Sequence, residues 1–285
     1  MRRARQLIGL AIAILACAPS IARAQLCHPG ADGDMEDMDH DHMQHMEGME
    51  GMEGMKMPAP PAITARADVE VDAATIQSGG YLGFVPTVSI SGWRLEGRIS
   101  APVYHLEYRG VKSDGPGDLL FSLSGTIVQA HRARAGVALA VTEDTGNGAL
   151  GLGMGDAMWM PGVWGSISRG DYGAVASVSY GRMQSLDDGM GGHHHAGSVG
   201  SLVNPMNHQE LAGAVRGTLR ATRALRLHVL ASVATPIDIE GTTRAYAATG
   251  VHYRIDAWEI GLEAALGLAG DPFHTRFALD LARTF

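Results

Sequence analysis

The chain has 285 residues, of which 46% are hydrophobic and 18% charged, and its formal net charge is -8 at pH 7. Beyond its first residues, no segment has the roughly 18 consecutive apolar residues that a membrane-spanning helix needs. The negative charge argues against a nucleic acid as partner and suits the binding of cations.

The first 24 residues resemble a secretory signal peptide. Three arginines precede an apolar run from Leu7 to Ala16, and Ala22-Arg23-Ala24 offers a cleavage site before Gln25. As an alternative, residues 14–17 resemble a lipobox, which would leave a lipid anchor on Cys17. Cleavage after Ala24 removes four arginines, so the formal charge becomes -12. It leaves a single cysteine, so no internal disulfide is expected.

Residues 25–67 form a second region, rich in Met, His, Asp, Glu and Gly. Three prolines at positions 58, 60 and 61 predict a stiff spacer at its end. With almost no aliphatic or aromatic residues to bury, we expect a disordered tail. The tail carries eight methionines and three histidines within 23 residues, namely Met35, Met38, His40, His42, Met43, His45, Met46, Met49, Met52, Met55 and Met57.

These tail residues predict a metal site. Thioether sulfur is a soft, neutral ligand that suits Cu(I) and Ag(I), and imidazole adds affinity for Cu(II). The methionines recur every few positions, so a flexible chain can wrap several of them around one ion. We therefore predict copper as the bound metal, with Cu(I) preferred and Cu(II) as the second state. The alternative is an acidic low-complexity linker in which methionine is incidental.

From residue 68 onward the sequence alternates between apolar and polar residues in short runs separated by turns. Such runs predict half-buried strands, and they cover residues 93–99, 104–109, 119–127, 137–141, 225–233, 251–255, 258–268 and 273–285. Runs of this kind are typical of a membrane β-barrel, which closes its sheet and leaves no unpaired backbone in lipid. We expect an all-β, antiparallel transmembrane barrel of about twelve strands over residues 68–285. A soluble β-sandwich is the alternative.

The connections between these runs favour the barrel. Counting back from Phe285, they alternate between long connections, expected outside the cell, and short ones, expected in the periplasm. The connections expected outside the cell are 110–118, 143–162, 183–208, 236–242 and 270–271. Those expected in the periplasm are 131–133, 170–171, 221–223 and 256. An even strand number then places the tail in the periplasm and the barrel in the outer membrane.

The last residues, FHTRFALDLARTF, end on Phe285. This ending resembles the signal read by the barrel-insertion machinery, although Arg283 stands where that signal usually has an aromatic residue. We therefore expect the insertion machinery and outer-membrane lipid as partners.

The polar face of the runs predicts a lumen with interspersed charges of both signs. Charges in a narrow barrel must pair or be hydrated, so we expect a paired, largely filled lumen in which each histidine belongs to a hydrogen-bond network. The residues assigned to this face are Arg94, Glu96, Arg98, His105, Glu107, Arg109, Arg216, Arg226, His228, His252, Arg254, Glu259, Glu263, His274, Arg276 and Asp280.

The longest connection predicts a second metal site. It contains Met183, Met190, His193, His194, His195, Met206 and His208, and its glycines would let the histidines converge. A weaker set in the preceding connection comprises Met154, Asp156, Met158 and Met160, for which ordinary loop residues are an equal alternative. The sequence has no nucleophile–base pair, phosphate-binding Gly loop or H-E-x-x-H motif, so we expect no enzyme.

The tail MEDMDHDHMQHMEGMEGMEGMKM, between a signal peptide and a β-barrel, is similar to the outer-membrane copper-resistance proteins of the B type. The resemblance implies copper tolerance, by sequestration or export at the outer membrane, with copper ions as ligand and a periplasmic copper protein as a partner. Two further functions are consistent with the residues, a small passive outer-membrane channel and a structural surface barrel.

Overall fold

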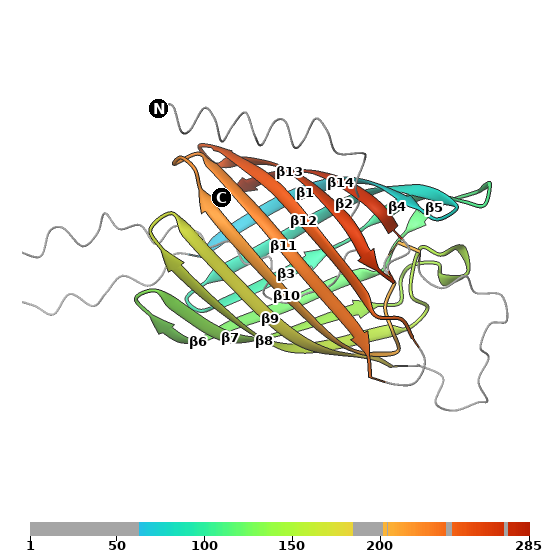
Figure 1. Ribbon diagram of the computed structural model, residues 1–285, viewed down its shortest axis with the longest axis horizontal. Helices are drawn as coiled ribbons and strands as arrows, with labels where there is room; N and C mark the ends of the chain where they lie inside the picture. The colour runs from blue at the N-terminus through green and yellow to red at the C-terminus, as the bar shows by residue number, and fades with distance from the viewer. Residues whose placement is uncertain (1–62, 185–201, 204, 238–240, 271–272) are drawn as a thin grey trace, which may run out of the picture.

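One antiparallel sheet accounts for most of the residues that the structure describes, which are 63–184, 202–203, 205–237, 241–270 and 273–285 of a computed structural model (Figure 1). Its strand segments are β1 (Thr64–Ile76), β2 (Gly79–Gly92), β3 (Leu95–Ser100), β4 (Val103–Tyr108), β5 (Val111–Pro116), β6 (Leu119–Ala130), β7 (Ala133–Glu143), β8 (Ala157–Arg169), β9 (Tyr172–Gln184), β10 (Gln209–Arg220), β11 (Leu225–Pro236), β12 (Arg244–Ile255), β13 (Trp258–Ala269) and β14 (Phe273–Thr284). A short 3-10 helix covers Gly148–Leu150.

The sheet closes into a barrel because β1 pairs with both β2 and β14. β3 and β4 pair with successive halves of β2, and they pair in turn with β6 and β5. β3 and β4 therefore form one strand of the barrel, and β5 and β6 form another. Counted in this way, the closed barrel has 12 strands. This confirms the antiparallel barrel of about twelve strands expected from the sequence. β1 begins at Thr64, inside the range assigned to the linker.

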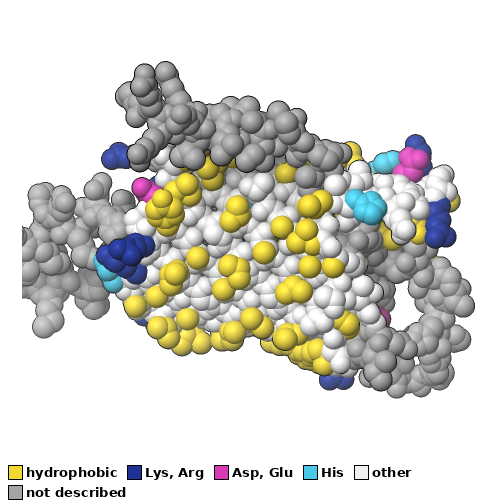
Figure 2. Space-filling view, viewed as in Figure 1, with side chains coloured by type: hydrophobic (Ala, Val, Ile, Leu, Met, Phe, Trp, Pro, Cys, Tyr) yellow, Lys and Arg dark blue, Asp and Glu magenta, His cyan; other side chains and the backbone are white. Residues whose placement is uncertain are grey.

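The outer face of the barrel is apolar. On β11, for example, Val229 and Val233 are 61% and 46% exposed, whereas Leu230 and Ser232 between them are buried. Figure 2 shows apolar side chains spread over this face, with charged side chains gathered toward its two ends. Exposed aromatic residues lie near one end at Trp93, Tyr172, Tyr253, Trp258 and Phe285, and near the other at Phe84, Phe121, Trp159 and Tyr180. Such girdles mark the two edges of the lipid band of a membrane barrel.

No helix among the described residues is long and apolar enough to cross a membrane.

The two ends of the barrel differ. At the terminus end, Thr64 and Phe285 lie side by side, since Ala65 and Phe285 exchange backbone hydrogen bonds, and the turns are short. At the loop end lie the long connections 144–156, 185–208 and 237–243. The alternation of long and short connections predicted from the sequence is therefore present. Two of the predicted loops are shorter, because β8 starts at Ala157 and residues 111–116 continue the sheet as β5.

The sequence assigned the wrong face to His105, Glu107 and Arg109. Residues 95–108 keep one alternation across the break at Pro102, so Tyr104 and Leu106 point inward and the polar residues between them point out. The hairpin of β4 and β5 projects from the loop end (Figure 1), where a polar exterior contacts water. There His105 Nδ1 lies 2.6 Å from Asp114 Oδ1.

His274 is also outside the lumen, contrary to the sequence prediction. The register of β14 against β1 shifts between Thr75 and Ile76, so that Thr75 faces Thr275 but Ile76 faces Phe273. This irregularity inverts the alternation at the start of β14, which buries Phe273 and exposes His274. A bulge changes the face of every residue beyond it.

Described residues of two connections lie in the mouth of the barrel at the loop end. Leu152 from the connection 144–156 and Leu202 and Val203 from the connection 185–208 pack against Tyr104 and Leu106 in one apolar cluster, which also contains Ala74, Ile76, Tyr81 and Phe273. The backbone N–H of Leu202 donates to the carbonyl of Gly151 at 3.0 Å, which joins the two loops.

Candidate functional site: the barrel lumen

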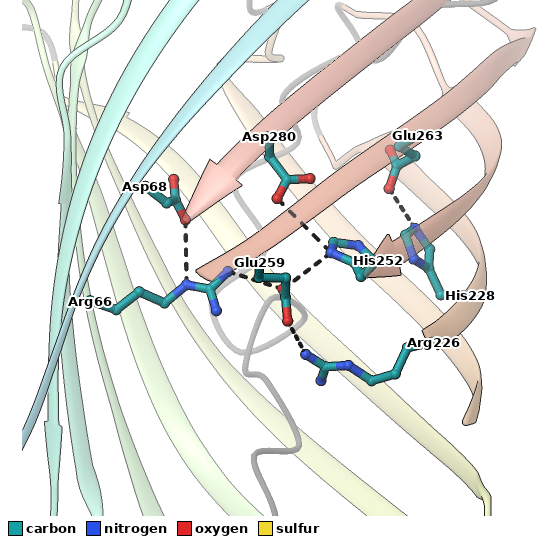
Figure 3. A network of polar contacts seen from close by, with 8 residues as sticks. All are labelled: Arg66, Asp68, Arg226, His228, His252, Glu259, Glu263 and Asp280. Atoms are coloured by element: carbon teal, nitrogen blue, oxygen red, sulfur yellow. Dashed lines mark hydrogen bonds and ion pairs between the residues drawn. The ribbon is translucent and has the colours of Figure 1, made fainter. Parts of the chain in front are cut away.

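Charged side chains gather on the inner face of five neighbouring strands, β1 and β11 to β14. The alternation of each strand turns every second residue inward, and the inward set is Arg66, Asp68, Glu70, Asp72, Arg226, His228, Arg244, His252, Arg254, Glu259, Glu263, Arg276 and Asp280. Figure 3 shows eight of these residues converging from the five strands. Both signs interleave, and we call the set the charge ladder.

Glu259 is the centre of the ladder near the terminus end. Its side chain is 5% exposed and accepts a hydrogen bond from Arg66 Nη2 at 3.3 Å on Oε1 and another from Arg226 on Oε2. His252 Nδ1 lies 3.2 Å from Oε1 (Figure 3). Buried charges require such partners, because an unpaired ion in a low-dielectric interior is costly.

A second pair lies next to this centre. His228 Nε2 is 2.7 Å from Glu263 Oε2, and both side chains are almost fully buried. The rings of His228 and His252 lie 5.1 Å apart, so the two groups form one continuous network. His228 and His252 are thus members of a structural network, as the sequence predicted.

One group in the ladder has ligand atoms close enough to share a cation. Single ligand atoms of His252, Glu259 and Asp280 lie within 4.8 Å of one another. However, the same carboxylate of Glu259 already faces the guanidinium groups of Arg66 and Arg226. Two fixed positive charges oppose a third at this position, so we assign the group to the ladder rather than to a metal centre.

The ladder continues toward the middle of the barrel. Arg276, whose side chain is fully buried, donates from Nε to Asp72 Oδ2 at 2.6 Å and from Nη2 to Glu70. Nearer the loop end, Arg244 donates to Glu210, which also accepts from the backbone and side-chain nitrogens of Asn207 at 3.0 Å each. The charges therefore extend along the lumen from the terminus end to the loop end.

The wall across the barrel is different. The strand order places β7, β8 and β9 opposite the charged strands. Most inward residues of β7 and β9 are small, namely Gly136, Ala138, Ala140, Thr142, Ser177, Ser179 and Gly181, although Arg134, Val175 and Met183 share these faces and β8 turns Met158 and Met160 inward. On the charged wall, a Cβ at Gly250 would lie 2.3 Å from His228 Cε1, and one at Gly261 would lie 1.7 Å from Asp280 Oδ2. Glycine lets these polar side chains lie flat against the neighbouring strand.

At the loop end, Asp118 holds the connection 144–156 in place. Its carboxylate accepts the backbone N–H of Gly146 at 2.9 Å and that of Met154 at 2.7 Å. Burial raises the pKa of the Asp118 carboxyl above its usual value, and the hydrogen bonds from Met154 and Gly146 act in the opposite direction. The residue is 7% exposed.

Most metal ligands predicted from the sequence lie outside the described residues. These ligands are the methionines and histidines of the tail from Met35 to Met57, Met190 and the histidines 193–195. The predicted signal peptide also lies outside the described residues. Of the other predicted ligands, Met206 packs against Met158 and Met160 inside the barrel. His208 is exposed, and its carbonyl accepts the backbone N–H of Met183 at 2.8 Å.

The sequence analysis missed the inward charges of β1. Arg66, Asp68, Glu70 and Asp72 alternate with Ala67, Val69, Val71 and Ala73, which is the strand period. The sequence prediction ends the linker at residue 67 and defines no strand between residues 68 and 92, whereas β1 covers Thr64–Ile76. The sequence prediction also placed Met154, Met158 and Met160 in a different set from Met183 and Met206, whereas the fold brings all five together.

No family model and no curated protein matches the sequence. Among solved structures, the chain is similar to the NanC porin, with 9% identity and a TM-score of 0.55 over 76% of this chain and 98% of that one. It is also similar to an outer membrane channel from Pseudomonas putida F1, with 11% identity and a TM-score of 0.59 over 84% of this chain and 100% of that one. At this identity the likeness concerns the fold, which is that of outer-membrane barrels.

Proposed function

We propose that this chain is a narrow outer-membrane channel for small polar or ionic solutes. The observation that carries the proposal is the asymmetry of the lumen, where a ladder of paired charges on β1 and β11 to β14 faces a wall of mostly small or uncharged side chains on β7 to β9. Charges of both signs can replace water around a small ion or zwitterion, and small residues opposite leave room for it. The porin and the channel with similar folds support this choice over a structural barrel.

The lumen would be narrow rather than wide. Glu259, Glu263 and Arg276 all point inward, yet each is at most 5% exposed. In a wide, water-filled pore such side chains would be solvated. We therefore expect small conductance and strong dependence on the lumen charges.

The experiment compares ion selectivity in planar bilayers. Glu259→Gln removes the negative charge that balances Arg66 and Arg226, so the lumen gains positive charge. We expect the zero-current potential in a KCl gradient to move toward the chloride value. Glu107→Gln is the matched control, since it neutralises a carboxylate on the outside of the β4–β5 hairpin.

Folding of both variants is checked by the different gel migration of unboiled and boiled barrels. The proposal is contradicted if the folded wild type shows no conductance, or if Glu107→Gln shifts selectivity as much as Glu259→Gln.

A copper function is a second proposal. It rests on the thioether and imidazole residues of Met35 to Met57, whose chemistry favours Cu(I). Deletion of residues 31–57 would remove copper tolerance in a growth assay and leave bilayer conductance intact. If the deletion strain grows in copper as well as the wild type, the copper function is contradicted and only the channel proposal remains.

A further inference from the structure

All five methionines of the described residues lie in one cluster inside the barrel. The cluster has Ala140, Met158 and Met160 at its centre, with Leu120, Met154, Met183 and Met206 packed around them. The two other apolar clusters of the lumen contain Ala, Ile, Leu, Val, Tyr and Phe but no methionine among their described members. If methionine served here only as a flexible filler, it would not be confined to one of the three clusters.

The fold brings these methionines together from four chain segments. Met158 and Met160 are two residues apart on β8 and share its inward face, where they are 0% and 2% exposed. Met158 stands directly opposite Met183 of β9, and side chains at such positions lie within contact distance. Met206 arrives from the segment before β10, and Met154 from the connection 144–156.

The surroundings accommodate the Met158 side chain and hold the backbone at Met154 and Met183. A Cβ at Gly181 would lie 2.2 Å from Met158 Cε, so this glycine makes room for the Met158 side chain. The backbone N–H groups of Met154 and Met183 are bonded to Asp118 and to the carbonyl of His208. Met154, Met183 and Met206 are only partly buried, unlike Met158 and Met160.

The charge next to the cluster has the sign that a bound cation needs. Thioethers are neutral, so a metal ion held by them keeps its charge and requires a counter-ion in a buried site. Asp118 is buried, two residues from Leu120, and its carboxylate accepts the N–H of Met154. Among the described residues no ion pair to Asp118 is present, unlike Glu210, which faces Arg244.

We propose that Met154, Met158, Met160, Met183 and Met206 form a binding site for a soft monovalent cation, Ag(I) or Cu(I), with Asp118 as its counter-charge. Thioether sulfur selects these ions over Zn(II), Mg(II) and Ca(II). The site lies in the barrel near the loop end, and it is separate from the tail. It does not depend on the channel proposal, because binding and conduction are measured independently.

The test is a titration of the full-length protein in nanodiscs with silver nitrate in chloride-free buffer. The probe is the methyl resonance of each methionine, labelled with carbon-13 and assigned by single Met→Leu substitutions. These swaps nearly conserve volume and typically cost under about 1.5 kcal/mol, so the barrel stays folded. We expect the five barrel resonances to shift together and saturate with Ag(I), and to stay unchanged with Zn(II).

Three variants define the site. The double substitution Met183→Leu and Met206→Leu should abolish the saturable shift of the Met158 and Met160 methyl resonances. Asp118→Asn should weaken Ag(I) binding at the barrel about tenfold or more, as loss of an outer-shell partner does, whereas Asp114→Asn on the exposed hairpin should not. Leu at the eight tail methionines should leave the barrel shifts intact.

Barrel resonances that stay fixed while tail resonances move would overturn the site. The site would also be overturned if the Met158 and Met160 resonances shifted as much in the Met183→Leu, Met206→Leu variant as in the wild type, because the ion would then be bound elsewhere.

Discussion

Arg276 shows how the lumen charges are held at the residue scale. It is 1% exposed and contacts the carboxylates of Asp72 and Glu70, which lie more than two hundred residues away in the chain. Removing one partner of a buried ion pair leaves an uncompensated charge, which costs far more than the pair contributes.

We predict that Arg276→Gln lowers the free energy of unfolding by about 3–5 kcal/mol, because Asp72 and Glu70 would be left buried without a cation. Urea titration of the barrel in detergent measures this change. Adding Asp72→Asn and Glu70→Gln to the variant should restore much of the loss.

The matched control for this prediction is Lys112→Gln. Lys112 is 64% exposed and pairs with Glu107 on the outside of the hairpin. Loss of an exposed pair costs at most about 1 kcal/mol. Equal effects at positions 112 and 276 would show that the Arg276 contacts do not hold the lumen together.

At the scale of elements, small irregularities decide what each strand presents to the lumen. The break at Pro102 leaves the alternation of β3 and β4 in phase, so Tyr104 and Leu106 enter the apolar cluster at the mouth. The register shift near Thr75 inverts the start of β14 and places Phe273 in the same cluster. The apolar mouth is therefore built by one strand pair that keeps its alternation across a break and by one register shift that inverts it.

The connection 144–156 depends on one carboxylate. We predict that Asp118→Ala leaves the N–H groups of Gly146 and Met154 without their acceptor, at a cost of about 1–3 kcal/mol for each unsatisfied group. Hydrogen exchange measured by mass spectrometry should then become faster in residues 144–156.

Asp114→Ala provides the comparison, since the Asp114 side chain is 77% exposed and holds no loop. Exchange in residues 144–156 should not change in that variant. Unchanged exchange in Asp118→Ala would mean that the loop is held by its other contacts, those of Leu152, Gly151 and Thr145.

At the scale of the whole molecule, closure of the sheet fixes the position of both chain ends. Because the number of strands is even, Thr64 and Phe285 lie at the same end, where all turns are short. In outer-membrane barrels short turns face the periplasm and long connections face outward.

We predict from this rule that a peptide tag inserted at Gly110, the tip of the β4–β5 hairpin, is stained by antibody on intact cells. A tag in the turn between β10 and β11, at residues 221–224, should be stained only after the cells are permeabilised. The physical reason is that the two sites lie at opposite ends of a barrel embedded in the membrane. The reverse labelling would invert the topology.

The fold class, the approximate strand number and the two unlike ends could all be predicted from the amino-acid order. These follow from local order, because the period of two sets strands and faces, and the spacing of runs sets the connections. The sequence also indicated that lumen histidines such as His228 and His252 would belong to a polar network, since charged residues of both signs shared their face.

Which residues contact one another depends on how the strands pair and how the barrel closes. Arg276 reaches Asp72 because the last strand pairs with the first, and Met158 reaches Met206 because two connections fold inward over neighbouring strands. The face of His274 depended on a register shift that local alternation does not reveal, whereas the face of His105 follows from an alternation that runs on across Pro102. Contacts across the barrel are set by closure and register, and these are properties of the paired sheet rather than of any one run of residues.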